Sequence, residues 1–537
     1  MKSCVNTVYG PSSLLPPVLS ARVRHRAAAN LGLQPHFFER AIMYSERQKQ
    51  ILVEITRGLA VPELAWDAVQ VEQSPSYIDS VIETADFAAT VVGAIGSVVA
   101  SVGERRGLGK QLVKVDRRHA QLLFNEVAYF FQSGWQFDIG DVFTPVNSFY
   151  RTRDDREIFF NGAYQHLRDG ILRFLDCPSD HDAIAKRVAQ HDAQPLEDGL
   201  SAVGLCAAIK RSPEEWRAHP QGQALEGVPP IELNRLTDGP PVALEPAAFR
   251  PLDKLRVVDF THVIAGPTIA KLLAEHGADV IHCRYPYQDH ILGFDVDTSF
   301  GKKNTYTDLR TDGDRRLALE LIRDCDVFVQ GFRWGSFARR GFGPEDLCRI
   351  NPRLIYVDVN AYGFQGPWAE RRGWEQLVQA ATGLAVQHSA KLGKSALIPA
   401  YFNDYGSGCL GALGVLAALL RRADEGGSWL VRVALAKTAM LGTRFADNHE
   451  PAEPITDAEL DRYLVDQESP IGLLTRIAPA VGLDRTPAYV DRAGSFPGSS
   501  TLDIGWGPDL LVPRAVPHRP TSIFRLGLAR RRGPQTL

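Results

Sequence analysis

The chain has 537 residues, of which 45% are hydrophobic and 23% are charged, and its formal net charge at pH 7 is -3. This length allows two or three domains with hydrophobic cores, and the composition is that of an ordinary globular protein. Because the net charge is slightly negative, it gives no electrostatic ground for a nucleic-acid partner.

The beginning of the chain differs in composition from the rest. The first 38 residues contain no Asp or Glu but carry three arginines, which is similar to a mitochondrial transit segment. We interpret residues 1–44 as a flexible leader, and we expect a cytoplasmic protein with the mitochondrion as the alternative location. No apolar run reaches the roughly 18 residues that a membrane-spanning helix needs, so we expect no membrane partner.

One design occurs twice along the chain: a helix rich in small residues, a glycine-containing turn and an alternating strand. The stretch ADFAATVVGAIGSVVASVGERRGLGKQLVKVD and the stretch NDYGSGCLGALGVLAALLRRADEGGSWLVRVA align without a gap at an offset of 318 residues. Asp86 then meets Asp404, and Gly96 meets Gly414. A gapless register of this length indicates an internal duplication. We assign residues 45–144 to a remnant of the first copy.

The next part of the chain predicts a separate mixed unit over residues 145–240. FYRTRDDREIFFNGAY predicts a hairpin with a charged turn, and HDAIAKRVAQHDAQPLEDGLSAVGL predicts amphipathic helices. In SPEEWRAHP, Ser212 is the expected N-cap of a further helix, with Glu215 three residues on. We therefore predict a small α+β domain, followed by a Pro-rich linker at 241–254.

From residue 255 to 445 strands alternate with helices. LRVVDFT, ADVIHCR, DVFVQGF and RLIYVDVN predict short apolar strands, and GPTIAKLLAEHG and GDRRLALELIRDC predict helices between them. This alternation predicts a parallel sheet covered on both faces. Such sheets bind ligands beyond the carboxyl ends of their strands, where THVIAGP, GFRWG and NAYGFQGPW fall. Residues 446–537 are interpreted as a Pro/Gly-rich tail without chemistry.

Several of these stretches resemble the class III CoA-transferase family, also called the CaiB/BaiF group, in family order and spacing. They include RVVDFTHVIAGPTIAKLLAEHGADVI, GKKNTYTDLRTDGD, DVFVQGFRWGSFARRGFGPEDLCRINPRLIYVDVNAYGFQGP, GWEQLVQAATG and NDYGSGCLGALGVLAALL. The resemblance covers about two thirds of the chain. It implies an α/β fold with a Rossmann-like parallel-sheet large domain, here 255–445, and a smaller α+β domain. The chain then combines an incomplete first copy with the CoA-binding domain of a second copy.

The resemblance also implies a nucleophile. In this family an Asp within a GYDxxxQAxxG-like motif attacks the acyl-CoA thioester, and Glu375 occupies that position in GWEQLVQAATG. A carboxylate can serve as a covalent nucleophile, but the additional methylene of Glu displaces its oxygens by roughly 1 Å, and such a displacement can be costly for a rate. From the residues alone, Glu375 has an alternative role as a favourable charge in the first turn of a helix.

CoA carries a diphosphate and a ribose phosphate, which need cations or backbone N–H groups. Lys302 and Lys303 match a basic pair of the family, and Arg333 matches the Arg of its NFRPG stretch. For each, the alternative is an ordinary solvated charge. Lys271, where the transferases usually have Gln, and His262, in the loop after the first strand, complete the set of candidate CoA-binding residues. The spacing of Cys and His residues predicts no metal site.

Two further features flank the candidate nucleophile. Arg371 and Arg372 precede it in the chain, and a nearby cation would keep Glu375 ionised. Asp404 resembles the Asp of the family's AD motif, and we expect it to cap its own helix, with a role in positioning the site as the alternative.

The sequence therefore predicts a CoA-transferase that moves CoA between an acyl-CoA and a carboxylic acid through a covalent intermediate on Glu375. One alternative is an acyl-CoA racemase or epimerase, although the His that racemases carry in this motif is replaced by Trp374 or Glu375. The other is a catalytically degenerate paralogue that binds acyl-CoA. CoA is expected as a substrate, without a metal, and the assembly is expected to be a monomer or a homodimer.

Overall fold

The computed structural model describes residues 44–59, 61, 68–137, 144–447, 451–507 and 516–517. The predicted leader lies outside the described residues except for Tyr44, and so does most of the predicted tail after 507.

The main sheet follows the pattern of the sequence. Its strands lie in the order β11-β10-β9-β12-β13-β14-β8. They are β8 (Glu232–Arg235), β9 (Arg256–Phe260), β10 (Asp279–Arg284), β11 (Lys302–Tyr306), β12 (Val327–Gln330), β13 (Ile355–Asn360) and β14 (Trp429–Ala434). All pairings from β9 to β14 are parallel, and β8 is antiparallel to β14. The predicted parallel α/β sheet is confirmed. Its strand order reverses at β9, which places a crevice between the loops after β9 and β12.

Helices cover both faces of this sheet because successive strand residues point in opposite directions. In β9, Val257 belongs to the same core as α10 (Ala265–Glu275) and α16 (Phe402–Glu425), whereas Val258 belongs to the core of α12 (Asp312–Asp324) and α13 (Pro344–Ile350). The remaining elements between β10 and β14 are α11 (Leu292–Asp297), η4 (Ala338–Arg340), α14 (Glu375–Thr382) and α15 (Leu384–Leu392).

The internal repeat is visible as a repeated arrangement of elements. Helix α3 (Thr84–Arg105) leads into β2 (Val113–Asp116) and α4 (Arg117–Leu123), as α16 leads into β14 and α17 (Leu435–Arg444). Strand β2 pairs in parallel with β1 (Val69–Glu72) and antiparallel with β17 (Gly482–Leu483). Strand β14 pairs with β13 and β8 in the same two senses. The two segments therefore share backbone arrangement as well as sequence.

Glycine permits the same close helix-to-strand approach in both copies. A Cβ atom built on Gly96 would lie 2.5 Å from Cγ1 of Val113, and one built on Gly414 would lie 2.6 Å from Cγ1 of Val431. Both distances are shorter than a van der Waals contact, so only glycine fits without a shift. Val113 and Val431 are themselves related by the offset of 318 residues.

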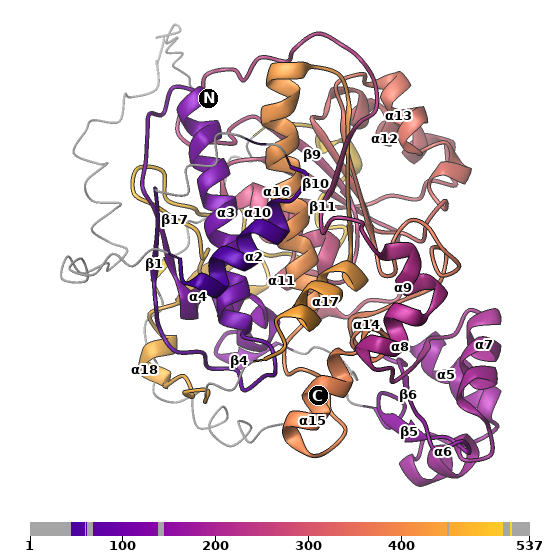
Figure 1. The fold of residues 1–537 in the computed structure, drawn as a ribbon. Coiled ribbons are helices and arrows are strands. Elements are labelled where there is room, and N and C mark those ends of the chain that lie inside the picture. Colours follow the sequence, from indigo (N-terminus) through magenta and orange to yellow (C-terminus); the bar gives the residue numbers. More distant parts are fainter. Residues whose placement is uncertain are drawn as a thin grey trace, which may run out of the picture. The chain divides into compact units, whose positions relative to one another are not determined.

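Helix α3 corrects one expectation from the sequence. It is long and apolar enough to cross a membrane by length and composition alone, so the statement that no stretch reaches that length was wrong. However, 94% of its apolar window is buried inside the protein, where α3 packs against α2 (Glu46–Thr56), α4 and α16. Figure 1 shows α3 and α16 running side by side. The apolar surface of α3 thus serves helix packing in this structure.

The equivalent Asp residues of the two copies, Asp86 and Asp404, differ in their hydrogen-bond and ion-pair partners. Asp86 accepts hydrogen bonds from Nε of Arg117 at 2.8 Å and from Nε2 of Gln48 at 2.9 Å. Arg117 also pairs with Glu83 at 3.2 Å and donates to a backbone carbonyl. The residue equivalent to Arg117 in the second copy is Leu435. The first-copy carboxylate is therefore neutralised, whereas its second-copy counterpart, Asp404, pairs with no cation among the described residues.

The small mixed unit has its own hydrophobic core. The predicted hairpin is β5 (Phe149–Arg151) and β6 (Glu157–Phe160), to which β7 (Ala207–Ile209) adds in an antiparallel sense. The predicted helices are confirmed as α6 (His181–Val188) and α7 (Ala193–Ala202), next to α5 (Gln165–Leu175). Ser212 forms the expected capping box with Glu215 at the start of α8 (Pro213–Ala218), which is followed by α9 (Pro220–Leu225).

Part of the predicted tail folds onto the first copy. Strands β15 (Leu464–Ser469) and β16 (Gly472–Ile477) form a sheet with β3 (Phe131–Gln132), β4 (Trp135–Gln136) and β18 (Val516–Pro517). The remaining short elements are η3 (Glu126–Tyr129), α18 (Asp457–Leu460) and η5 (Leu502–Ile504). The sequence interpretation emphasised the Pro and Gly content of this region and did not predict the alternating strands LVDQES and GLLTRI.

Replacement of Arg117 by Leu, the residue of the second copy, leaves two buried carboxylates without their cation. We expect Arg117→Leu to lower the free energy of unfolding by roughly 3–5 kcal/mol, the usual cost of breaking a buried ion pair from one side. Chemical denaturation measures this loss. The control is Arg151→Leu, which removes the solvent-exposed pair with Asp155 and should leave the unfolding midpoint unchanged. Equal stability of the two variants would contradict this account.

Candidate functional site

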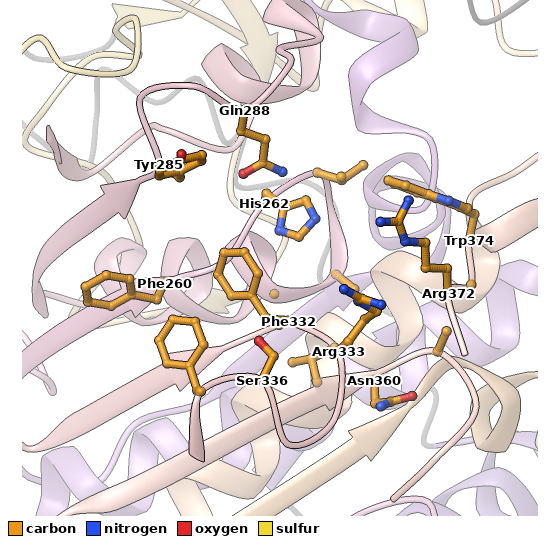
Figure 2. A pocket seen from close by; sticks show the side chains of 18 of the residues that line it. Phe260, His262, Tyr285, Gln288, Phe332, Arg333, Ser336, Asn360, Arg372 and Trp374 are labelled. Carbon is orange, nitrogen blue, oxygen red and sulfur yellow. The ribbon is translucent and has the colours of Figure 1, made fainter. Parts of the chain in front are cut away.

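A cavity of about 720 Å³ lies at the carboxyl ends of the parallel strands. Its walls include the last residues of β9 and β13 and the loops after β10, β11 and β12, as expected for a sheet whose strand order reverses at β9. The residues that line it from these positions include Phe260, His262, Tyr285, Phe332, Arg333 and Asn360 (Figure 2). The loop and helix around the candidate nucleophile close another side with Arg372, Trp374 and Asp404.

Aromatic side chains form much of the cavity wall. The ring of His262 lies 5.2 Å from the ring of Phe332, between the centroids. Trp374 packs against Tyr164 at 5.2 Å and donates its indole N–H to the sulfur of Cys206 at 3.3 Å. These contacts give the cavity an apolar wall of fixed shape, suited to the carbon skeleton of a ligand.

Arginine side chains supply the cationic part of the cavity. Arg333 and Arg372 both line it, and Figure 2 shows them on the side of His262 where Trp374 lies. Within the described residues neither guanidinium is paired with a carboxylate. Burial, followed by the charge of Arg372, lowers the pKa of Arg333. Unpaired guanidinium groups that repel one another are stabilised by a bound anion, and phosphate is a group that they bind well.

Glu375 is the first residue of α14, and only 3% of its surface is exposed. Its Oε2 accepts from the backbone N–H of Asp404 at 2.7 Å. Its Oε1 accepts from the backbone and side chain of Asn403, at 3.2 and 3.1 Å, and from Gln379 at 2.8 Å. The two backbone donors belong to the first turn of α16. Glu375 therefore caps the neighbouring helix, a role that such unpaired N–H groups require.

Asp404 lies beside Glu375 and lines the cavity. Within the described part of the chain its carboxyl group accepts no hydrogen bond, so the expectation that Asp404 caps its own helix was wrong. Burial and the adjacent charge of Glu375 raise the pKa of Asp404 well above its usual value. The two carboxyl groups form a coupled pair, and such a pair holds a proton more strongly than a single exposed carboxyl.

In the part of the chain that the structure describes, neither Arg371 nor Arg372 pairs with Glu375 as expected. Burial raises the pKa of Glu375 to about 7, although four hydrogen bonds oppose the shift. Arg371 instead lies against the ring of Trp368 and pairs with Glu197 at 3.8 Å, while Arg372 lines the cavity. Glu375 is thus poised to gain or lose a proton near neutral pH, as groups in active sites often are.

The predicted lysines lie away from the cavity. Nζ of Lys302 bonds to Asp259 at 2.9 Å and to the carbonyl of Pro267 at 2.7 Å, and its side chain is fully buried. Nζ of Lys303 pairs with Asp279 at 3.2 Å and also bonds to a backbone carbonyl. Both belong to β11 and hold it to neighbouring segments. This geometry does not support phosphate contacts for either residue, which remain a prediction from the sequence.

The other two candidates have different locations. Lys271 is buried in α10 and pairs with Glu126 of η3 at 2.5 Å, which joins the second copy to the first. His262 lines the cavity as predicted, and its Nδ1 has no hydrogen-bond partner in the described residues. Burial lowers the pKa of His262 to about 4, so its imidazole is neutral at pH 7. Of the six predicted residues, the structure therefore places Arg333 and His262 at the cavity and Glu375 directly behind it.

The small unit contributes a wall that the sequence interpretation did not anticipate. Tyr164, His166 and Leu167, at the start of α5, line the cavity. Nδ1 of His166 lies 2.8 Å from Oδ2 of Asp289 in the loop after β10, and this contact connects the two sides of the cavity. No local sequence pattern marks these residues, because their role depends on how the small unit packs against the main sheet.

Comparison with known proteins gives one family. The family model of CoA-transferase family III matches residues 252–457. An acetyl-coenzyme A transferase of Hypoxylon pulicicidum is 34% identical over 324 residues, which cover 54% of this chain and 53% of that protein. A probable fatty acyl-CoA transferase of Mycobacterium tuberculosis is 34% identical over 204 residues, which cover 36% and 52% of the two chains. The chain spans about half the length of these curated relatives.

Solved structures with some likeness include a CaiB/BaiF family protein from Brucella suis. It has 24% sequence identity and a TM-score of 0.34, with 42% of this chain and 65% of that chain covered. A hypothetical protein from Mycobacterium tuberculosis has 36% identity and a TM-score of 0.34, with coverage of 36% and 55%.

Because Lys302 is buried, we expect its replacement to destabilise the fold. Lys302→Met leaves Asp259 charged and unpaired in the core, so we expect a loss of roughly 3–5 kcal/mol in the free energy of unfolding. The matched control Lys394→Met changes an exposed lysine and should alter stability by no more than about 0.5 kcal/mol. Urea unfolding of both variants gives the comparison. A Lys302→Met protein as stable as the control would show that the buried pair is not needed.

Proposed function

We propose that this chain transfers CoA from an acyl-CoA to a carboxylic acid in the cavity described above, because residues 252–457 match the model of CoA-transferase family III. The observation that carries the proposal is the placement of a coupled carboxyl pair, Glu375 and Asp404, beside a cavity that also holds unpaired arginines. Acyl transfer through a carboxylate needs a reactive carboxyl group, and CoA needs cations for its phosphates.

The side of the cavity that carries arginines is suited to binding the phosphate groups of the acyl-CoA donor. Arg333 and Arg372 line the cavity without carboxylate partners in the described residues, and Arg339 and Arg340 line it further along the same loop. A diphosphate placed here gains charge-assisted hydrogen bonds and relieves the repulsion among the guanidinium groups. The aromatic wall formed by Phe260, Phe332 and Trp374 accommodates the less polar parts of the acyl-CoA.

The carboxyl pair supplies the covalent step. The motif position predicts Glu375 as the nucleophile, and the structure adds Asp404 as a second carboxyl that faces the cavity. In our proposal a carboxylate of this pair attacks the thioester carbonyl carbon, the C–S bond breaks, and CoA leaves as a thiolate. The acyl group is then held as an anhydride of the enzyme. Burial of the pair excludes water that would hydrolyse this anhydride.

A chemical trap tests the transfer. We expect incubation with an acyl-CoA, followed by hydroxylamine or borohydride, to leave a hydroxamate or a reduced carboxyl group on Glu375 or Asp404, because both reagents attack an activated carboxyl. Peptide mass mapping locates the change, and a sample treated with free CoA in place of acyl-CoA is the control. Exchange of the substrate α-hydrogen with deuterated solvent, without an adduct, would indicate a racemase instead. Binding of acyl-CoA with neither reaction would indicate the degenerate paralogue.

The cationic side gives a separate prediction. We expect Arg333→Gln to raise the Kd for CoA roughly tenfold, because a charge-assisted hydrogen bond to phosphate contributes about 1.5–3 kcal/mol and this guanidinium is partly exposed. Titration calorimetry at low ionic strength measures the change. The control Arg316→Gln removes an exposed arginine of α12 that does not line the cavity, and its Kd should equal that of the wild type. Equal Kd values for all three proteins would place the phosphates elsewhere.

A further inference from the structure

We propose that Asp404 is the carboxyl group that carries the covalent intermediate, and that Glu375 is a positioning residue that holds the first turn of α16. This inference rests on the proposed function and reassigns its central residue. The motif points to Glu375, whereas the side chain that the fold presents to the cavity is Asp404.

Asp404 and Glu375 differ in their access to the cavity. Asp404 lines the cavity wall with Trp374 and Arg372, and Glu375 does not. Glu375 instead contacts the backbone of Asp404, whose N–H group donates to Oε2 of Glu375 at 2.7 Å. A thioester in the cavity therefore meets the carboxyl group of Asp404 first.

Glu375 and Asp404 also differ in the number of hydrogen bonds that their carboxyl groups accept. Both oxygens of Glu375 accept hydrogen bonds, and two of the four donors are backbone N–H groups in the first turn of α16. A rotation of Glu375 toward the cavity would leave these donors unpaired, at a cost of roughly 1–3 kcal/mol for each buried group. The carboxyl group of Asp404 accepts no hydrogen bond within the described residues, so it can react without breaking any contact.

The internal repeat provides a comparison within the same molecule. In the first copy, the equivalent Asp86 is buried by α2 and bonded to Arg117 and Gln48. In the second copy, the position of Arg117 is taken by Leu435, which itself lines the cavity. The repeat thus contains an arrangement that satisfies this carboxyl group, and the second copy lacks it. A buried polar group left unsatisfied where a satisfied version exists is expected at a functional position.

The surroundings of Asp404 favour a reactive carboxylate. The titratable groups that face it are Glu375 from α14, Tyr401 from the turn before α16 and Tyr164 from the small unit. None of these three groups is a cation; Arg372 lines the same cavity, but its charge is not among the causes that shift the pKa of Asp404. A desolvated carboxylate without a cation retains its electron density for attack on a carbonyl carbon. Because burial and Glu375 raise the pKa of Asp404, its reactive form grows as the pH rises.

The steps balance with Asp404 as the carrier. Its ionised Oδ attacks the thioester carbon, the C–S bond breaks, and CoA leaves as a thiolate, giving an acyl–Asp404 anhydride. The thiolate then attacks Cγ of Asp404, which releases the donor as a carboxylate and leaves an Asp404–CoA thioester. The acceptor carboxylate attacks Cγ and expels the thiolate again. Finally the thiolate attacks the acceptor carbonyl, which forms the new acyl-CoA and regenerates the Asp404 carboxylate.

Two variants decide between the residues. With Asp404→Asn we expect complete loss of the trapped adduct and of transfer, with CoA affinity within about twofold of the wild type because the phosphates bind elsewhere in the cavity. With Glu375→Gln we expect an adduct that still maps to Asp404. Its formation should reach half of its maximum at a lower pH than in the wild type, because loss of the neighbouring charge lowers the pKa of Asp404. A purely structural role of Glu375 would leave this pH profile unshifted.

Other results overturn the inference in distinguishable ways. An adduct on Glu375 in the wild type, lost in Glu375→Gln and kept in Asp404→Asn, would refute the role of Asp404 and leave the proposed CoA transfer intact. An adduct on neither residue would refute the proposed function as well. Thermal unfolding of both variants serves as the folding control, and we expect Asp404→Asn to be no less stable than the wild type because it removes a carboxyl group without partners.

Discussion

The contact between Glu375 and the first turn of α16 organises the site. It joins the start of α14 to the start of the long helix that both the main sheet and α3 pack against. Because the carboxylate accepts two backbone N–H groups, it fixes the direction in which α16 begins and therefore the direction of Asp404. The position of the cavity-facing carboxyl is thus a consequence of helix capping by its neighbour.

The duplication explains how this arrangement is supported. Helices α3 and α16 come from equivalent segments and pack against each other, and Figure 1 shows them side by side. Their surroundings differ in charge: the first copy has an Arg–Asp–Glu cluster, and the second has a carboxyl pair without a cation. The pair between Lys271 and Glu126 further ties the second copy to the first.

The lysines and arginines singled out above differ in location: the lysines lie in the core, and the arginines line the cavity. Lys302, Lys303 and Lys271 are buried and all pair with carboxylates, whereas Arg333 and Arg372 line the cavity without carboxylate partners among the described residues. Burial of an ammonium group is tolerated only with a close partner, so the buried lysines are committed to the fold. Arginine, which is always charged and less strongly hydrated, suits the role of an exchangeable anion site.

The sequence by itself determined the parallel sheet, the repeat and the segments that reach the carboxyl ends of the strands, because these depend on local periodicity and on a fixed register. It also marked His262 through its place in the loop after a strand, and Arg333 through the resemblance of its stretch to the family. Tertiary structure alone decided that Lys302 and Lys303 point into the core, since both belong to a strand whose two faces are covered. It likewise decided that Tyr164 closes the cavity and that Asp404 faces it while Glu375 lies behind. Those assignments depend on contacts between residues far apart in the chain, such as Glu375 with Asp404, and no local pattern of residues specifies which of two neighbouring carboxyl groups is exposed.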